Sequence, residues 1–178
     1  MDIERELLKE HSRRTADRIA AWVGSDARRF RKLMELFLEG EKTVTQRAAM
    51  AVGICAERHP ALAGPYIGRM LGRMEQPGVH VAVRRTVVRM LQHVEIPPGL
   101  LGRVATLCFN YLASPGSPVA VRVFSMTVLA RIAAREPDLR RELRLVIEQG
   151  KPYGSKGYCS RAARILKELE GKPTPAGS

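Results

Sequence analysis

Arginine is the residue type with which this chain could do the most chemistry. The chain carries 30 basic and 18 acidic residues, and 23 of the basic residues are arginines. Four of these follow one another at intervals of 38, 37 and 39 residues: Arg47, Arg85, Arg122 and Arg161. A guanidinium is permanently charged and carries five N–H donors in a planar fork that matches carboxylates and phosphates. The chemistry that this spacing offers is therefore the binding of anionic groups.

Residue types that perform catalysis or bind metals form no recognisable motif. The four histidines lie mainly at the ends of predicted helices: His11, His59, His80 and His93. None of them has the HxxxH or HExxH spacing that places two metal ligands on one helical face. The sequence therefore predicts no metal site, no cofactor and no catalytic residue, and we do not expect an enzyme.

The cysteines and the apolar segments indicate where such a protein would work. Cys55, Cys108 and Cys159 lie far apart in apolar helical contexts. Their odd number and the absence of a CxxC pair predict buried thiols in a reducing compartment, so a cytoplasmic location is expected. The longest apolar stretch, at residues 48–56, is far too short to span a bilayer, so we expect no membrane partner.

The elements that must position the arginines are helices. Phe30, Leu33, Met34 and Phe37 recur at the three-and-four spacing of one buried helical face, with Ser25 or Asp26 before them as a cap. Similar patterns, separated by glycine or proline, predict helices at residues 2–11, 12–23, 26–39, 43–58, 61–74, 79–94, 100–112, 119–134, 139–149 and 158–169. No stretch alternates with period two for long enough to predict a strand. The predicted fold class is all-α.

The four spaced arginines each stand near the start of an expected second helix of a pair. The phrases around them are Thr45-Gln46-Arg47-Ala48-Ala49, Val83-Arg84-Arg85-Thr86-Val87, Val121-Arg122-Val123-Phe124 and Ser160-Arg161-Ala162-Ala163. A steady period of this size is typical of helical arrays in which each repeat buries its apolar face against its neighbours. With these phrases, the chain resembles HEAT-like repeats of the armadillo-type α-solenoid superfamily over about residues 25–170.

This resemblance implies a right-handed α-α superhelix of about four helical pairs, with an extra N-terminal helix or two. We expect a single domain over residues 1–170 and a disordered tail over residues 171–178, which is rich in glycine and proline. Second helices line the concave surface in this superfamily, so aligned arginines would form a basic strip. The candidate partner-binding residues are Arg47, Arg69, Arg73, Arg85, Arg89, Arg122, Arg161 and Arg164.

The superfamily commonly pairs this arginine with an acid six residues earlier, in a polar ladder between repeats. Only Arg47 has such an acid, because Glu41 precedes it. The corresponding positions before the other three arginines hold Val79, Gly116 and Ser155. An arginine without its ladder acid must find backbone carbonyls, another acid, solvent or a ligand. Arg85, Arg122 and Arg161 are therefore the residues at which a ligand is to be sought.

Three functions are compatible with these residues. The first is a non-enzymatic scaffold that binds an acidic protein partner or subunit through the basic groove. The second is a nucleic-acid module that contacts phosphates, because residues 59–135 hold nine basic and two acidic side chains. The third is a HEAT-like DNA glycosylase, which needs an acid and aromatic side chains around an extruded base. Only Glu75 and Glu95 supply acids between residues 59 and 135, which disfavours the glycosylase. We favour the scaffold, because this is the usual use of the architecture that the resemblance implies.

Overall fold

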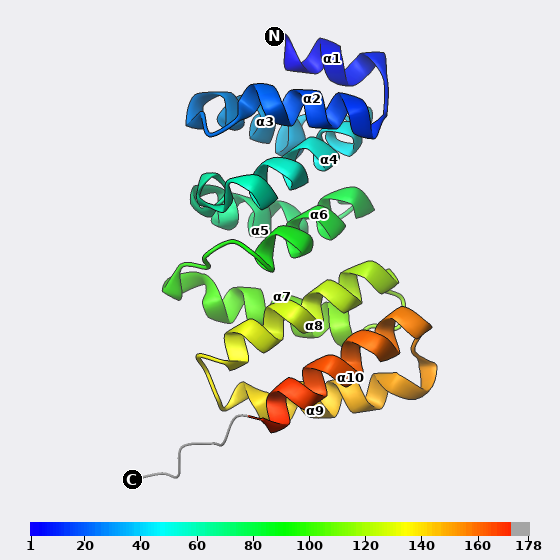
Figure 1. Cartoon of the computed structure of the whole chain (residues 1–178). Helices are drawn as coiled ribbons and strands as arrows, with labels where there is room; N and C mark the ends of the chain where they lie inside the picture. Colours follow the sequence, from blue (N-terminus) through cyan, green and yellow to red (C-terminus); the bar gives the residue numbers. More distant parts are fainter. Residues whose placement is uncertain (172–178) are drawn as a thin grey trace. The chain divides into compact units, whose positions relative to one another are not determined.

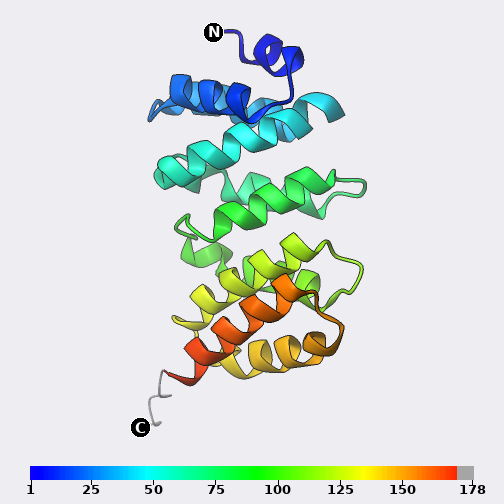
Figure 2. The ribbon, with the colours of Figure 1, turned by 45° about the vertical axis from the view of Figure 1, so that its right-hand side comes forward.

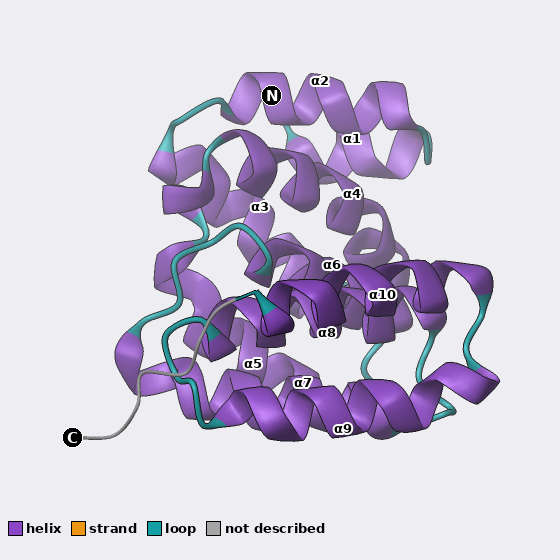
Figure 3. Cartoon of the chain, turned by 60° about the horizontal axis from the view of Figure 1, so that its bottom comes forward, coloured by secondary structure: helices purple, strands orange, loops and turns teal. Residues whose placement is uncertain are grey.

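The structure, a computed structural model, describes residues 1–171 and is all-helical within them. It contains ten α-helices, four short 3-10 helices and no strand in this range, which confirms the predicted fold class (Figures 1 and 3). None of the described helices is long and apolar enough to cross a membrane. The chain divides into two compact units, an N-terminal unit of residues 1–97 and a C-terminal unit of residues 98–178.

The N-terminal unit consists of six α-helices. They are α1 (Ile3–Lys9), α2 (Arg13–Val23), α3 (Ala27–Glu39), α4 (Lys42–Arg58), α5 (Ile67–Glu75) and α6 (Val81–Leu91). Polar side chains begin the first three, since Asp2, Ser12 and Asp26 accept hydrogen bonds from free backbone N–H groups of α1, α2 and α3. Of the two predicted caps for α3, Asp26 makes these bonds and Ser25 does not.

Helix α5 begins six residues later than the sequence pattern predicts. Residues 60–66 form two 3-10 turns, Pro60–Leu62 and Gly64–Tyr66, instead of the first turns of an α-helix. Pro65 lacks a backbone N–H and disfavours helical conformation in the residue before it, so the chain turns again before the helix can start at Ile67. Apolar spacing alone does not register this interruption.

Helix α4 is the centre of the N-terminal unit. It packs against α3 and lies between α2 and α6, an arrangement visible in Figures 1 and 2. More than half of its residues are buried, and the α3 residues Phe30, Leu33 and Phe37 are inaccessible to solvent in the adjoining core. Because α4 is covered on several sides, its residues between α2 and α6 form the middle of a surface that three helices build together.

The C-terminal unit consists of four α-helices around α8. They are α7 (Leu101–Ala113), α8 (Val119–Ala133), α9 (Leu139–Gly150) and α10 (Lys156–Glu170), with short 3-10 turns at Pro98–Leu100 and Lys151–Tyr153. Helix α8 contacts the other three and is buried on most of its circumference. Helix α10 starts two residues earlier than predicted because the Ser155 hydroxyl accepts a hydrogen bond from the Tyr158 N–H, at 3.2 Å.

The helical order agrees with the predicted repeat arrangement. Helices α3 to α10 form four successive pairs, and α1 and α2 are the two extra N-terminal helices. The single domain expected over residues 1–170 stays a prediction beside the two compact units. Of the tail expected over residues 171–178, only Gly171 lies in the described part, and the rest falls outside it.

Candidate partner-binding surface

A groove of about 360 Å³ lies on the N-terminal unit over α2, α4 and α6. We call it the α4 groove. Its lining residues are His11, Arg13, Gln46, Ala49, Met50, Gly53, Arg85, Thr86 and Arg89. Helix α4 supplies the small and apolar residues in the middle, whereas α2 and α6 supply arginines at the two sides. The groove therefore combines an apolar middle with basic walls.

Two acids hold most of the arginines at this groove in place. Arg13 Nε lies 2.8 Å from Asp17 Oδ2, and Arg58 Nη2 lies 3.0 Å from the other oxygen of the same carboxylate. Arg89 pairs with Glu57. The hydrogen bond from Arg13 lowers the pKa of Asp17 below its ordinary value, and the charge of Arg58 adds to this effect. These acids are therefore already engaged within the chain.

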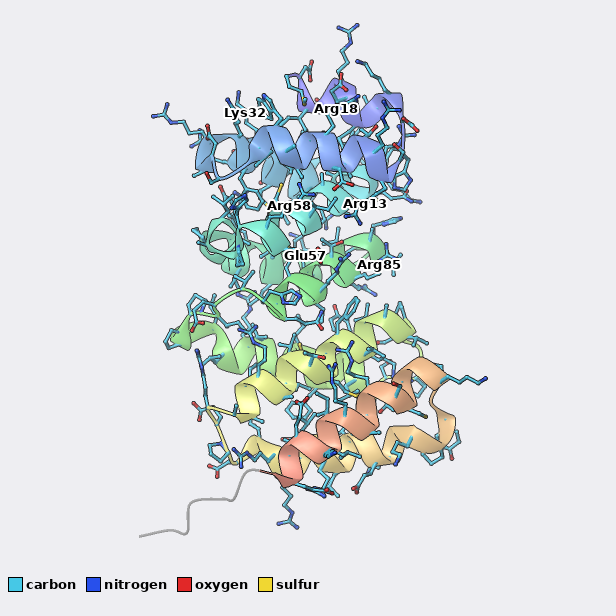
Figure 4. All side chains as sticks on the ribbon, in the orientation of Figure 1. Arg13, Arg18, Lys32, Glu57, Arg58 and Arg85 are labelled. Carbon is cyan, nitrogen blue, oxygen red and sulfur yellow. The ribbon has the colours of Figure 1, made fainter. Side chains whose placement is uncertain are left out.

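Arg85 differs from its neighbours because it has no partner. Its side chain is exposed on α6, and within residues 1–171 it makes no hydrogen bond, ion pair or aromatic contact. Figure 4 shows it with Arg13, Glu57 and Arg58 on the face formed by α2, α4 and α6. Asp17 and Glu57 offset only part of the positive charge of the arginines on this face. The guanidinium of Arg85 therefore remains available to an anion from outside the chain.

Three of the predicted binding residues in the N-terminal unit are held by contacts inside it. Arg47 donates from Nη1 to the carbonyls of Leu7 and Leu8, both at 3.0 Å, and so satisfies the C-terminal end of α1. It takes this carbonyl role instead of the ladder pair with Glu41. The other two fasten α5 to α3: Arg69 pairs with Glu39, and Arg73 Nε donates to the Leu38 carbonyl at 3.0 Å.

Two predicted binding residues lie on α10 and have contacts within the C-terminal unit. Arg161 donates to the Thr127 hydroxyl of α8, and burial of its guanidinium lowers its pKa. Arg164 Nε lies 3.5 Å from Glu168 Oε1, one helical turn further along the surface. Unlike Arg85, both residues therefore have partners within the chain.

Arg122 has a structural role, which differs from the ligand role considered for it. Its side chain is buried, with 8% exposure, and its Nε donates to the Leu112 carbonyl at the end of α7, at 3.2 Å. The guanidinium carbon lies 4.5 Å from the centre of the Tyr158 ring, which is a cation–π distance. The ladder acid missing before Arg122 is thus replaced by a carbonyl and an aromatic face, two partners on other helices.

Tyr158 completes this buried cluster. Its hydroxyl donates to the Ile147 carbonyl at 3.3 Å, and burial raises the pKa of the phenol. The ring lies close to two glycines, because a Cβ at Gly150 would come within 2.8 Å of Tyr158 Cζ and one at Gly154 within 3.1 Å of Cγ. The end of α9 and the turn before α10 therefore need small residues so that Tyr158 can support Arg122.

The cysteines differ in burial but all carry free thiols. Cys55 and Cys108 are buried, whereas Cys159 is half-buried, contrary to the sequence prediction, with its Sγ 3.6 Å from the carbonyls of Lys151 and Gly154. Desolvation raises the pKa of the Cys55 thiol from 9.0 to about 11 and that of Cys108 to about 12. In the described part, no group of three His, Cys, Asp or Glu side chains could hold a metal ion.

These two thiols predict a loss of stability in alkaline solution. Because the folded state raises both pKa values, its stabilisation is complete below pH 9 and declines as the pH rises toward 11 and 12. We expect the urea midpoint, followed by circular dichroism, to fall between pH 9 and 11. The double variant Cys55→Ala/Cys108→Ala should show a shallower fall, with the remainder assigned to Tyr158. An equally steep fall in the variant would contradict the prediction.

The sequence prediction missed one side of the α4 groove. The arginine period begins at Arg47, and it therefore selected no residue from α2, although Arg13 lines the groove. Gln46, Met50 and Gly53 were not among the predicted residues, because none of them carries a charge. The signal that could have found them is their spacing of three and four residues along one side of a helix.

A comparison with protein families gives a match that agrees with the helical pairs around this groove. Residues 3–169 match the family described as HEAT repeat domain. The chain belongs to the HEAT repeat family. HEAT repeats generally act as protein-interaction scaffolds and are typically non-enzymatic. No curated protein and no solved structure matches the chain. For this HEAT repeat protein, the surface itself must therefore indicate what is bound.

Proposed function

We propose that this HEAT repeat protein is a non-enzymatic scaffold that binds an acidic protein partner through the α4 groove. The observation that carries the proposal is the unpartnered guanidinium of Arg85 beside arginines already held by Asp17 and Glu57. A partner carboxylate would pair with Arg85 in bidentate geometry. The positive charges of Arg13 and Arg89 would add to the attraction while these side chains keep their ion pairs with Asp17 and Glu57. Binding therefore needs no rearrangement of the groove.

The groove favours a protein over a nucleic acid as the partner. Its middle is lined by Ala49, Met50 and Gly53, which offer contact to apolar atoms. Asp17 and Glu57 stand beside the arginines and would repel a continuous run of phosphates. The lining residues also include no Phe, Tyr or Trp side chain on which a base could stack. Nucleic-acid binding, the alternative that the net charge of +12 favours, is kept as an outcome of the test.

The charge reversal Arg85→Glu tests the proposal. The purified protein is used to capture partners from a nuclease-treated lysate of the native host, and captured proteins are quantified by mass spectrometry. We expect a partner whose capture by Arg85→Glu falls about tenfold or more and whose binding weakens with salt. The matched control is Arg31→Glu, at another exposed arginine, on α3 outside the groove, which should retain capture.

Two results would contradict the proposal. Equal capture by wild type and Arg85→Glu would exclude the α4 groove as the binding surface. A mobility shift of duplex DNA or RNA that Arg85→Glu/Arg89→Glu abolishes, without any captured protein after nuclease treatment, would establish the nucleic-acid alternative. The slope of the logarithm of the binding constant against the logarithm of the salt concentration would then give the number of phosphates contacted.

A further inference from the structure

A second pocket, of about 520 Å³, lies on the N-terminal unit between the end of α3 and α5. We call it the α5 pocket. Helix α3 contributes Leu38 and Glu39, and the rest of the lining comes from α5 and the residue that caps its C-terminal end: Arg69, Gly72, Arg73 and Gln76. The α5 pocket shares no lining residue with the α4 groove. Its polar groups therefore belong to a separate site.

The two arginines of this pocket are held in place by the chain itself. Arg73 donates from Nε to the Leu38 carbonyl at 3.0 Å and from Nη1 to Gln76 Oε1 at 2.8 Å. Arg69 is held by its ion pair with Glu39. Residues four apart are neighbours on one face of a helix, and both arginines border the same pocket. Little conformational freedom is therefore left to lose when a ligand binds.

The hydrogen-bonding groups that remain open in the α5 pocket are mainly donors. Arg73 Nη2 and Gln76 Nε2 have no partner in the described part of the chain. Arg69 has further N–H groups besides the Nη2 that pairs with Glu39. Guanidinium and amide nitrogens cannot accept a hydrogen bond. A ligand that satisfies these groups must therefore present several acceptor oxygens.

A tetrahedral oxyanion matches these donors better than a carboxylate does. A carboxylate is planar, and a single guanidinium fork already satisfies both of its oxygens. The α5 pocket instead offers two guanidiniums and an amide from three different residues. A phosphoryl group has three strong acceptor oxygens, which point in different directions, and it is negatively charged. Two arginines against one glutamate give the lining a net charge of +1, which favours such an anion.

We propose that the α5 pocket binds the phosphoryl group of inorganic phosphate or of a small phosphate monoester between Arg69, Arg73 and Gln76. This inference goes beyond the proposed function, because it concerns a small ligand on other helices. The phosphoryl oxygens accept hydrogen bonds from Arg73 Nη2, Gln76 Nε2 and Arg69, while Glu39 keeps Arg69 in position. The Arg69 side chain is 46% exposed, so the oxygen that carries the ester group can face solvent.

Titration calorimetry of the purified protein tests this inference, with inorganic phosphate, phenyl phosphate and acetate as probes. All titrations are done at neutral pH and constant ionic strength, so that general screening of surface charge does not change. We expect both phosphates to bind saturably and acetate to bind more weakly by about tenfold or more. Tighter binding of phenyl phosphate would identify a monoester as the ligand, whereas equal binding would identify phosphate itself.

Gln76→Glu is the variant that separates lost binding from lost folding. Its carboxylate still accepts the hydrogen bond from Arg73 Nη1, but it replaces the amide donor with a negative charge. We expect phosphate binding to weaken about tenfold or more, whereas Tm without phosphate should not change. Arg69→Gln, which removes one positive charge, should weaken binding by a similar factor. Gln149→Glu on α9 is the matched control and should bind phosphate as wild type does.

Three results would overturn the inference. The first is phosphate binding that neither Gln76→Glu nor Arg69→Gln weakens, and the second is acetate binding as tight as that of phosphate. The third is the loss of phosphate binding in Arg85→Glu, which would place the anion in the α4 groove. We expect Arg85→Glu to bind phosphate unchanged, whether or not it captures a protein partner. Failure of this inference and failure of the proposed function can therefore be distinguished.

Discussion

Replacement of Arg122 by alanine is expected to lower the free energy of unfolding by about 2–4 kcal/mol. The substitution removes the hydrogen bond to the Leu112 carbonyl and leaves that buried acceptor unsatisfied. It also removes the cation over the Tyr158 ring, an interaction that contributes about 2 kcal/mol when desolvated. Urea unfolding followed by circular dichroism measures the change, at a pH below 8 where the thiols stay protonated.

Arg85→Ala is the control for this prediction. The two arginines occupy equivalent positions of neighbouring repeats, 37 residues apart, yet Arg85 is exposed and has no partner in the described residues. We expect Arg85→Ala to change the free energy of unfolding by no more than about 0.5 kcal/mol. Similar values for both variants would mean that the buried contacts of Arg122 contribute little, and Arg122 would return to the list of ligand-binding candidates.

Phe30→Ala should have the largest effect on the N-terminal unit, a destabilisation of about 3–5 kcal/mol. The ring of Phe30 is inaccessible to solvent and meets Tyr66 edge to face, with ring centres 5.7 Å apart. Alanine removes this contact and leaves a cavity between α3 and the 3-10 turn that precedes α5. Differential scanning calorimetry measures the resulting shift in the melting temperature. Tyr153→Ala removes an aromatic ring that is 87% exposed and should leave stability unchanged.

Phe30→Ala and Arg122→Ala together test the domain prediction. Phe30 belongs to the N-terminal unit and Arg122 to the C-terminal unit. If residues 1–170 form a single cooperative domain, each variant should shift the same and only thermal transition. If the two units unfold separately, each variant should shift one transition and leave the other in place. The second result would replace the single domain with two.

The helices of this protein follow from local features that the sequence displays. Buried faces such as Phe30, Leu33 and Phe37 recur with the helical period, and caps such as Asp26 mark where a helix begins. The arginine period indicated helical pairs, because a repeat that buries its face against its neighbour must return to the same residue type at the same place. The sequence pattern places the start of α5 too early, because its apolar spacing continues through Pro65, whereas the helix begins at Ile67.

The role of each arginine was decided by the tertiary structure. Arg47, Arg85, Arg122 and Arg161 have the same place in the repeat, yet the structure gives them four environments: helix-end carbonyls, solvent, a buried ring and a hydroxyl. A guanidinium finds its partner at the end of a long side chain, on another helix that is distant in sequence. The sequence by itself thus determined which elements form and which residue types recur, whereas the packing of helices decided that Arg85 alone of these four faces the α4 groove without a partner in the described chain.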